Sequence, residues 1–338
     1  MNDIIDFVVT WLDSSDPEWQ KQFAKYKEEE TGRTENARFR NLDTLRYWFR
    51  AVEQYAPWVN KVYLVTNGTF PKWINANHPK LVLVKHSDYI PEEFLPTFNS
   101  ITIELFMHRI KGLSEHFVYF NDDFFLNAPT KPELFFRNGL PCDNNKESLY
   151  NVPVYNQDDK FGIYMSILAN IGVINAHFSR WDTVRKSIRR WYGAHLGTEG
   201  ILTSLLIKRH YKFVGFNWRH FEQPFLRSTF EKAWSEEPEM LQNSCTRFRS
   251  EITLNPYFFR YWQFATNKFY PTRHYKSSVF NLRVTKLEEI EKALNNKKIV
   301  SICLNDTANC PDEEFETINS RLQALLEKKF PNKSKYEI

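Results

Sequence analysis

The sequence contains few cysteines, and their spacing fits neither a metal site nor a disulfide framework. Cys142, Cys245, Cys303 and Cys310 are the only four among 338 residues. Closely spaced pairs would indicate a zinc site, and a dense set of cysteines in a short chain would indicate disulfides. Because neither pattern is present, we expect four free thiols, which are typical of a cytoplasmic protein.

The chain also lacks a long hydrophobic run and a signal peptide. No segment approaches the ~18 apolar residues that a membrane-spanning helix requires. Residues 1–6 include two acids and lack the basic flank and apolar core of an export signal. We therefore expect a cytoplasmic protein that is soluble or peripherally attached to the inner face of the membrane.

A strong excess of one charge is absent as well. Lys plus Arg number 45 and Asp plus Glu 41, a difference of +4. This small, dispersed excess argues against a nucleic-acid partner, whereas anionic small substrates remain compatible. Basic and aromatic residues are locally dense around a predicted helix at 181–192, which could contact anionic lipid or could be a solvated helix face. They are Arg180, Trp181, Arg185, Lys186, Arg189, Arg190 and Trp191.

Strands and helices alternate in the first third of the chain. Apolar stretches predict four strands, at 4–11, 62–66, 81–84 and 117–120. Amphipathic stretches predict helices between them, at 42–55 and 98–110. This alternation is typical of an α/β fold with a doubly wound, mostly parallel sheet, whose ligands bind beyond the carboxyl ends of the strands.

The length of the chain exceeds that at which single cores usually stop growing, so we expect one large domain with an insertion or two closely packed lobes. The α/β part is predicted at 1–129, and an inserted, partly helical lobe at 130–219. Residues 220–338 are predicted to return to the core, with helices at 256–266 and 313–329 and a buried strand at 298–304.

The apolar run at 117–125 is interrupted by Asn121, Asp122 and Asp123. Two adjacent carboxylates flanked by aromatic residues are costly unless something neutralises them. Mg²⁺ or Mn²⁺ suits such hard oxygen ligands, and the phosphates of a substrate commonly complete the coordination shell. The pattern therefore favours a metal and a phosphate-bearing donor, with a plain Asx turn as the alternative.

A second polar pair, Asn305 and Asp306, follows the predicted strand at 298–304. Two strand ends that meet at one sheet edge could share a metal, although the dipeptide alone is a weak signal and a plain turn explains it better.

Basic side chains that could act on a phosphate follow in two places. Arg247 and Arg249 lie on one side of an extended segment, where guanidinium groups could clamp a diphosphate or form a solvated charge pair. His220, among aromatic residues, could accept a proton or donate to a phosphoryl oxygen, and the alternative is a structural histidine.

The chain resembles the Stealth family in four blocks that occur in the family's order. The first block is residues 5–17, the third runs from 220 to 249, and the fourth is 303–306 with the helix that follows. The second is matched most densely, at 38–40, 45–47, 55–59, 63–68, 95–100, 108–110 and 121–123.

The resemblance implies a phosphotransferase, since the family includes bacterial capsule and surface-polysaccharide phosphotransferases. It implies transfer of a hexose or N-acetylhexosamine 1-phosphate from a UDP-sugar to a hydroxyl of a glycan or lipid-linked oligosaccharide, with release of UMP. It also implies Mg²⁺ or Mn²⁺, a nucleotide-sugar-binding fold of the Rossmann or GT-A-like type at 1–129, and an acceptor-side lobe at 130–219.

Matching positions supply the expected site residues. Those expected to be catalytic are Asp13, Asp123, His220 and Arg249. Those expected to bind substrate are Trp11, which could stack on the base, with Arg40, Asn67, Asn99 and Arg247. The expected metal ligands are Asp122, Asp123, Asn305 and Asp306.

Two departures from the family leave donor specificity open. Leu12-Asp13-Ser14 stands where relatives often have Val-Asn-Gly, and Ser250 stands where an acid is common. Two other functions fit the acids and aromatics: a metal-dependent glycosyltransferase that releases UDP, and a non-catalytic glycan-binding component of a polysaccharide assembly complex. The sequence does not indicate an oligomeric state.

Overall fold

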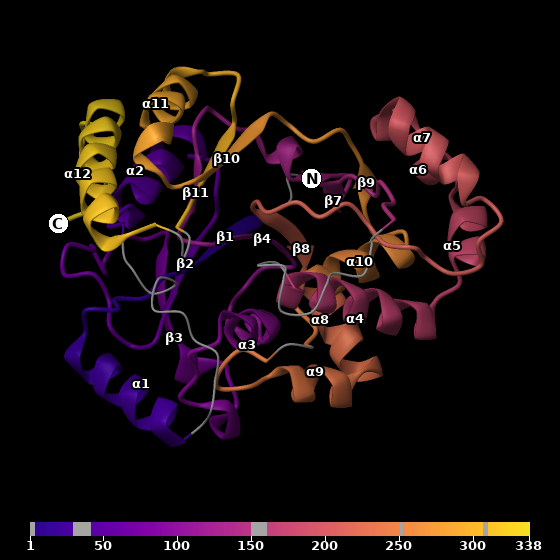
Figure 1. Cartoon of the computed structure of the whole chain (residues 1–338), viewed down its shortest axis with the longest axis horizontal. Coiled ribbons are helices and arrows are strands. Elements are labelled where there is room, and N and C mark those ends of the chain that lie inside the picture. The colour runs from indigo at the N-terminus through magenta and orange to yellow at the C-terminus, as the bar shows by residue number, and fades with distance from the viewer. Residues whose placement is uncertain (1–3, 30–41, 150–160, 251–252, 307–309) are drawn as a thin grey trace.

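A five-stranded sheet forms the centre of the molecule (Figure 1). The structure is a computed structural model, which describes residues 4–29, 42–149, 161–250, 253–306 and 310–338. The strand order is β3 (Leu81–Lys85), β2 (Val62–Thr66), β1 (Ile5–Thr10), β4 (His116–Phe120) and β8 (Gln223–Leu226). The first four are mutually parallel and β8 is antiparallel to β4. The predicted α/β class with a mostly parallel sheet is confirmed.

Side chains from successive strand positions enter two different hydrophobic cores. Phe7 and Val9 belong to one core and Val8 to the other, as expected when neighbouring side chains point to opposite faces of a sheet. Both faces are therefore covered, which makes this sheet doubly wound and explains why its strands are apolar at nearly every position.

Different helices cover the two faces. The face with Phe7 packs against α2 (Leu45–Tyr55), α11 (Leu287–Asn295) and α12 (Asp312–Lys329). The face with Val8 packs against α3 (Ser100–Leu105), α8 (Arg227–Glu236) and α10 (Tyr257–Ala265). The C-terminal third of the chain thus contributes to both layers, as Figure 1 shows.

A second, smaller sheet is connected to the first through the turn that follows β4. It consists of β10 (Ser277–Asn281), β11 (Ser301–Asn305) and β5 (Phe124–Leu126), with β10 parallel and β5 antiparallel to β11. Because β5 begins four residues after β4 ends, the turn at 121–123 joins the two sheets. A third small sheet contains β6 (Phe136–Arg137), β7 (Leu140–Asp143) and β9 (Tyr270–Pro271).

Several predicted elements differ in their limits. The helix predicted at 98–110 is α3 followed by a 3₁₀ turn at Met107–Arg109, and that at 181–192 is α5 (Arg180–Lys186) and α6 (Ile188–Trp191), separated at Ser187. Six helices were not predicted individually: α1 (Pro17–Glu29), α4 (Phe161–His177), α7 (Gly197–Leu206), α8, α9 (Pro238–Ser244) and α11.

Helices α4 to α7 lie within the stretch predicted as an inserted lobe, and the exact boundaries at 129 and 219 remain a prediction. Figure 1 shows α5, α6 and α7 together at one end of the molecule. Helix α4 packs against α10 and so ties this part to the core.

The prediction of a basic and aromatic helix face is wrong for two residues, Arg180 and Trp191, which are not exposed. Arg180 is buried and forms an ion pair with Glu147, Nη2 to Oε2 at 2.8 Å, and Trp191 is buried as well. Charge pairing and core packing, respectively, remove them from the surface.

All four cysteines are free, as predicted, and all four are buried. In the described part of the chain, no helix combines the length and the apolar character needed to cross a membrane.

A buried ion pair connects β7 to α10. Arg260 donates from Nε to Oδ2 of Asp143 at 2.6 Å and from Nη2 to Oδ1 at 2.9 Å. Burial by itself would raise the pKa of Asp143, but the Arg260 charge and hydrogen bonds outweigh it and lower the pKa below its ordinary 3.8. The carboxylate is therefore ionised at neutral pH and depends on its partner.

Replacing Arg260 should destabilise the fold strongly. Arg260→Met leaves the Asp143 carboxylate buried without its ion pair, so we expect the free energy of unfolding at neutral pH to fall by about 3–5 kcal/mol. Urea denaturation measures this change. Lys286→Met is the matched control, because it removes an exposed ion pair with Glu289 and should cost less than about 1 kcal/mol. Equal losses in the two variants would contradict the role of the buried pair.

The same pair gives an acid dependence of stability. Since the folded-state pKa of Asp143 is depressed, the stabilisation is present above 3.8 and is lost as the pH falls through the folded-state value. The stability difference between wild type and Asp143→Asn should therefore shrink as the pH falls below about 4.

Candidate functional site

The two predicted pairs of polar residues meet at the junction of the sheets. The backbone N–H of Leu304 donates to the carbonyl of Asp123 at 2.9 Å, in line with the antiparallel pairing of β11 and β5. Asn305 and Asp306 therefore continue β11 beside the turn that carries Asp122 and Asp123. Strand pairing therefore brings together two pairs of polar residues that lie about 180 positions apart in the sequence.

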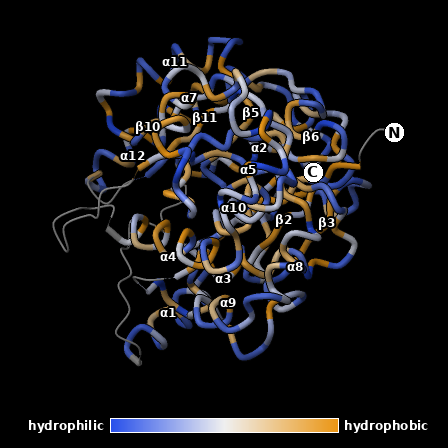
Figure 2. Tube along the Cα trace, turned by 90° about the vertical axis from the view of Figure 1, so that its right-hand side faces the viewer, coloured by the Kyte–Doolittle hydropathy of each residue, from blue (hydrophilic) through white to orange (hydrophobic). Residues whose placement is uncertain are grey.

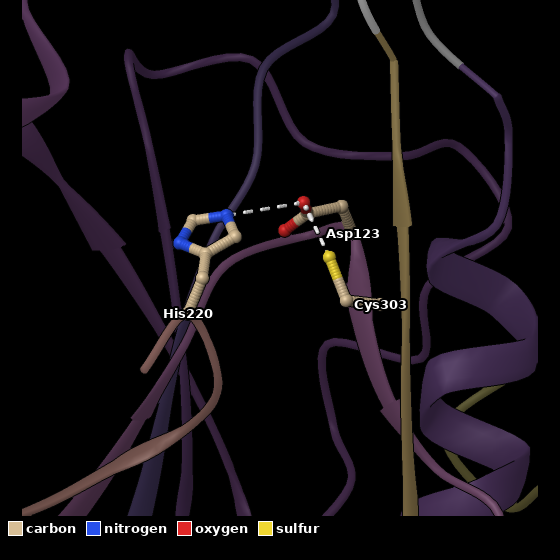
Figure 3. Close-up of side chains that lie close together, drawn as sticks. All are labelled: Asp123, His220 and Cys303. Atoms are coloured by element: carbon tan, nitrogen blue, oxygen red, sulfur yellow. Dashed lines mark hydrogen bonds and ion pairs between the residues drawn. The ribbon is translucent and has the colours of Figure 1, made fainter. Parts of the chain in front are cut away.

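Asp123 is the centre of a small group of ionisable side chains (Figure 3). Its Oδ2 accepts a hydrogen bond from the Cys303 thiol at 3.2 Å and lies 3.7 Å from Nε2 of His220. Its other oxygen, Oδ1, is buried and has no hydrogen-bond partner in the described part of the chain. An unpartnered buried carboxylate oxygen is costly, so this atom is a ready acceptor for a cation or a donor group.

The electrostatics of the neighbouring acid also favour a cation. Asp122 is exposed at the surface, yet the protein around its carboxyl and then the charge of Asp123 raise the pKa of Asp122 to about 7. Like charges held together in this way are relieved by a metal ion. The two carboxylates fit the predicted oxygen coordination of Mg²⁺ or Mn²⁺.

The structure offers a second donor set around Asp123 that the sequence did not indicate. Ligand atoms of Asp123, His220 and Cys303 lie within 4.8 Å of one another. Burial raises the pKa of the Cys303 thiol well above its usual value, and the charge of Asp123 acts in the same direction. Cys303 therefore acts as a hydrogen-bond donor to Asp123, a role that no spacing pattern reveals.

His220 is partly exposed, and its position is fixed through its neighbours in the chain. Its ring is nearly perpendicular to that of Phe124, with centroids 4.8 Å apart. On the N-terminal side, the carbonyl of Arg219 accepts a hydrogen bond from the Tyr257 hydroxyl at 2.7 Å, and that of Asn217 accepts one from Arg260 at 3.0 Å. Helix α10 therefore holds the segment that carries His220.

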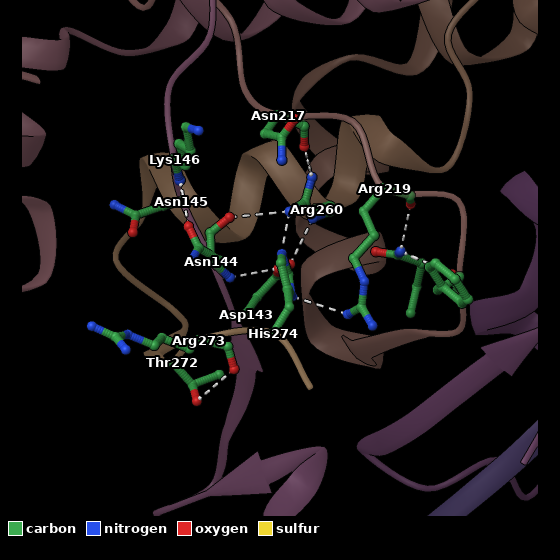
Figure 4. Close-up of polar contacts among 12 residues, drawn as sticks. Asp143, Asn144, Asn145, Lys146, Asn217, Arg219, Arg260, Thr272, Arg273 and His274 are labelled. Carbon is green, nitrogen blue, oxygen red and sulfur yellow. Dashed lines mark hydrogen bonds and ion pairs between the residues drawn. The ribbon is translucent and has the colours of Figure 1, made fainter. Parts of the chain in front are cut away.

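The Arg219 side chain adds a further attachment (Figure 4). Its guanidinium lies over the Tyr275 ring at 4.4 Å, and Nη1 is 2.9 Å from Nδ1 of His274. Burial lowers the pKa of His274 to about 3, and the charge of Arg219 contributes. A neutral His274 can accept this hydrogen bond, so the Arg219 side chain is held against the segment that follows β9.

Glu104 is a candidate that the sequence analysis missed. It lies in α3 and accepts a hydrogen bond from Tyr119 of β4 at 3.0 Å. Burial raises its pKa to about 7, whereas Arg249, Tyr119 and His220 each lower it. A carboxyl that titrates near neutrality beside Arg249 and His220 suits proton transfer. The signal was a single acid in the otherwise uncharged stretch at 100–107.

The two predicted arginines have different surroundings. Arg249 is exposed and donates from Nη2 to the Ser100 hydroxyl at 2.6 Å, at the start of α3. Arg247 donates to the carbonyl of Pro96 at 3.0 Å and lies over the Tyr26 ring at 4.2 Å. Arg249 is thus the one whose charge reaches Glu104, and Arg247 packs against α1.

Asp13 lies after β1 at the carboxyl edge of the sheet. Its Oδ1 accepts hydrogen bonds from the backbone N–H and hydroxyl of Ser15 at 3.0 and 2.6 Å. The pKa of Asp43 is raised mainly by burial, and the charge of Asp13 raises it further. Asp43 has φ of 52°, a conformation that non-glycine residues seldom adopt. No sequence pattern had marked Asp43 as a candidate site residue.

Asn67 also lies at this edge, directly after β2, where its Oδ1 accepts a hydrogen bond from the N–H of Thr69 at 3.3 Å. The following Gly68 has φ of 125°, which a residue with a side chain would adopt only under strain.

Two expected substrate-binding residues have structural roles instead. Asn99 is completely buried, caps α3 by accepting from Ile101 N–H, and donates to the carbonyl of Thr246. Trp11 is 9% exposed and packs in the core below β1, which leaves almost no ring surface for a base. Arg40 lies outside the described residues.

A doubly wound sheet with acids gathered beyond its carboxyl ends is the arrangement in which α/β proteins bind ligands at that edge. Comparison with known proteins agrees and adds the family. The profile of Stealth protein CR2, conserved region 2, matches residues 38–143.

Curated relatives match along the whole chain. The capsular polysaccharide phosphotransferase WcwK of Streptococcus pneumoniae is 37% identical over 98% of both chains. The receptor polysaccharide phosphotransferase WefC of Streptococcus oralis is 36% identical over 99% of both. The exopolysaccharide phosphotransferase cps2G of Lactiplantibacillus plantarum is 36% identical over 98% of this chain and 96% of the relative.

The chain therefore belongs to the Stealth family and is a phosphotransferase, which excludes the non-catalytic alternative. Among solved structures, the galactosyltransferase LgtC in complex with donor and acceptor sugar analogs covers 96% of this chain and 95% of its own, at 9% identity and a TM-score of 0.40.

Divalent metal should stabilise the wild-type protein through Asp123. At a metal concentration about 100 times the dissociation constant, the gain in unfolding free energy is about 2.7 kcal/mol. Thermal unfolding with Mg²⁺, with Mn²⁺ and with EDTA measures it. We expect the shift in Tm to vanish in Asp123→Asn and to persist in Glu288→Gln, which removes an exposed acid on α11. A shift that survives in Asp123→Asn would show that the metal binds elsewhere.

Proposed function

We propose that this protein transfers a hexose or N-acetylhexosamine 1-phosphate from a UDP-sugar to a hydroxyl of a glycan acceptor, in the biosynthesis of a capsular or cell-surface polysaccharide. The observation that carries the proposal is the buried, unpartnered Oδ1 of Asp123 beside Asp122 and His220. It supports a site for a metal-bound diphosphate. The printed names of the full-length relatives support polysaccharide as the setting.

The proposed reaction is an in-line displacement at the phosphorus that bears the sugar. The acceptor oxygen forms a bond to this phosphorus while the bond to the bridging oxygen of UMP breaks. The product is a phosphodiester between sugar and acceptor, and UMP leaves with the electrons of the broken bond. The acceptor hydroxyl gives up its proton to a base on the enzyme.

Two residues are candidates for that base, His220 and Glu104. Glu104 has a pKa of about 7, so near neutrality a substantial fraction is ionised and able to accept a proton. His220 lies nearer to Asp123, where it could instead donate to a phosphoryl oxygen. We assign Glu104 as the base and His220 as the hydrogen-bond donor to the phosphoryl group.

Negative charge on the phosphoryl oxygens has to be stabilised by the remaining residues. Arg249 supplies a guanidinium near Glu104, and Asp13 and Asn67 line the edge beyond β1 and β2 where the nucleotide would lie. Arg247 and Arg40 stay predicted substrate contacts. Mg²⁺ or Mn²⁺, held by Asp122 and Asp123 with Asn305 or Asp306, would neutralise the diphosphate and the leaving oxygen.

The residues predicted as the lobe at 130–219 would bind the acceptor, because their chain leads directly to His220. A lipid-linked oligosaccharide would be presented at the inner face of the membrane, with the enzyme in the cytoplasm.

Identification of the released nucleotide tests the reaction. Purified protein is incubated with UDP-N-acetylglucosamine, UDP-glucose or UDP-galactose, with Mg²⁺ or Mn²⁺ and a mixed glycan acceptor, and the nucleotide is separated by chromatography. We expect UMP, formed only when metal and acceptor are both present. UDP would make the enzyme a glycosyltransferase and overturn the proposed displacement.

Variants of the two candidate acid–base residues should differ in their pH dependence. As the pH rises through about 7, wild-type Glu104 loses its proton and the rate should increase. Glu104→Gln should be slower by about two to four orders of magnitude and should lack this rise. His220→Ala should be slowed by about two to three orders of magnitude but should keep the rise.

The matched control is Glu93→Gln, which removes an exposed acid from a 3₁₀ turn and should leave the profile unchanged. A Glu104→Gln enzyme that retains the rise near pH 7 would remove Glu104 as the base. Circular dichroism of each variant establishes that the fold is intact.

A further inference from the structure

Exposed hydrophobic side chains are concentrated in one short stretch of this protein. Among the described residues, eleven large hydrophobic side chains are exposed, and six of them fall within residues 181–212. They are Trp181, Ile188, Leu202, Leu205, Leu206 and Tyr211. Single exposed hydrophobic residues are ordinary, whereas a local cluster marks a contact surface.

Helix α7 has its apolar face turned outward. Leu202, Leu205 and Leu206 are spaced three and four residues apart, so they lie on one side of the helix, and they are 60%, 47% and 83% exposed. Gly200 and Ser204 are buried on the inner side. A surface helix normally buries its apolar stripe, so α7 presents this face to something other than water.

The same stretch carries a strong positive charge. Residues 181–212 contain seven Lys and Arg against two Asp and Glu, an excess of +5 that is larger than the +4 of the whole chain. The remainder of the protein is therefore close to neutral, and its positive charge is local.

Part of this charge surrounds a hollow between α5 and α6. The hollow has a volume of about 300 Å³ and is lined by Arg185, Ser187, Ile188, Arg189 and Arg190. Guanidinium groups with an exposed isoleucine between them offer both hydrogen-bond donors for a phosphate group and an apolar contact.

Buried anchors hold this surface on the body of the protein. Arg180 pairs with Glu147, and the indole N–H of the buried Trp191 donates to Asn267 at 2.9 Å. Helices α5, α6 and α7 lie at one end of the molecule in Figure 1, and Figure 2 views that end face-on. The exposed residues are thus presented by a fixed scaffold.

We propose that this end of the protein, the α5–α7 surface, binds an anionic phospholipid bilayer. The partner is indicated by charge complementarity, because lysines and arginines attract anionic headgroups while the leucines of α7 and Trp181 insert among the acyl chains. One of these signals alone gives weak, reversible attachment, and the α5–α7 surface combines both.

Docking in this way would orient the catalytic edge relative to the membrane. From Leu206 the chain continues through residues 207–219 to His220, so the surface and the candidate site are joined by one anchored segment. Binding to lipid does not depend on the proposed reaction, and its failure would leave that reaction untouched.

Sedimentation with lipid vesicles tests the proposal on the full-length protein. We expect the wild-type protein to sediment with vesicles of phosphatidylcholine and phosphatidylglycerol at low salt, less at high salt, and little with phosphatidylcholine alone. Arg185→Glu/Arg189→Glu should reduce the partition coefficient at least about tenfold. Leu206→Ser, with one apolar side chain removed, should reduce it by a smaller factor.

Matched controls change the same properties elsewhere. Lys21→Glu/Lys25→Glu on α1 alters the net charge equally, and Ile338→Ser removes a side chain that is 72% exposed; both should bind like wild type. UMP release with a soluble acceptor should be unchanged in the two control variants, and circular dichroism should show that all four variants are folded.

Three results would overturn the proposal: no sedimentation with anionic vesicles at low salt, equal losses in the α5–α7 and control variants, or self-association in light scattering that Leu206→Ser abolishes without any lipid binding. The last result would instead identify the α7 face as a contact between two copies of the chain.

Discussion

Two adjacent carboxylates at the junction of two sheets place the strongest constraint on this structure. Asp122 and Asp123 occupy the turn between β4 and β5, where Asp122 is exposed with a raised pKa and one buried oxygen of Asp123 has no partner in the described residues. Such an arrangement is stable only if the backbone around it is held firmly and if a ligand relieves the charge. Pairing of β11 with β5 supplies the first condition, and it brings Cys303 to Asp123 at the same time.

The candidate site also depends on the position of His220 relative to Asp123. His220 lies in a loop, and loops are held in place by their hydrogen bonds and packing. Here the carbonyls of Asn217 and Arg219 are both fixed by side chains of α10, and Arg260 in turn is fixed by Asp143. A buried ion pair in the third sheet thus contributes to the geometry of the site, which explains why a polar network is retained in an otherwise aromatic interior.

Different parts of the chain meet different functional requirements. The doubly wound sheet and its two cores account for stability and for the edge at which the acids gather. Helices α5 to α7 add a surface with exposed apolar residues and a local excess of positive charge. The contacts of Arg180 and Trp191 attach this surface to the core. The proposed membrane contact at one end and the proposed transfer reaction at the sheet edge therefore belong to one connected structure.

The sequence by itself determined the α/β class, the four parallel strands, the free cysteines and the family, because periodicity, strand-end chemistry and block order are local properties of the chain. It also placed Asp122, Asp123, His220 and Arg249 among the candidates. Only the tertiary structure decided that Asn99 and Trp11 are buried, that Arg180 is paired, and that Cys303 and Glu104 belong to the site. Burial, pairing across about 180 residues and the resulting pKa shifts arise from contacts between distant segments, and no local pattern encodes them.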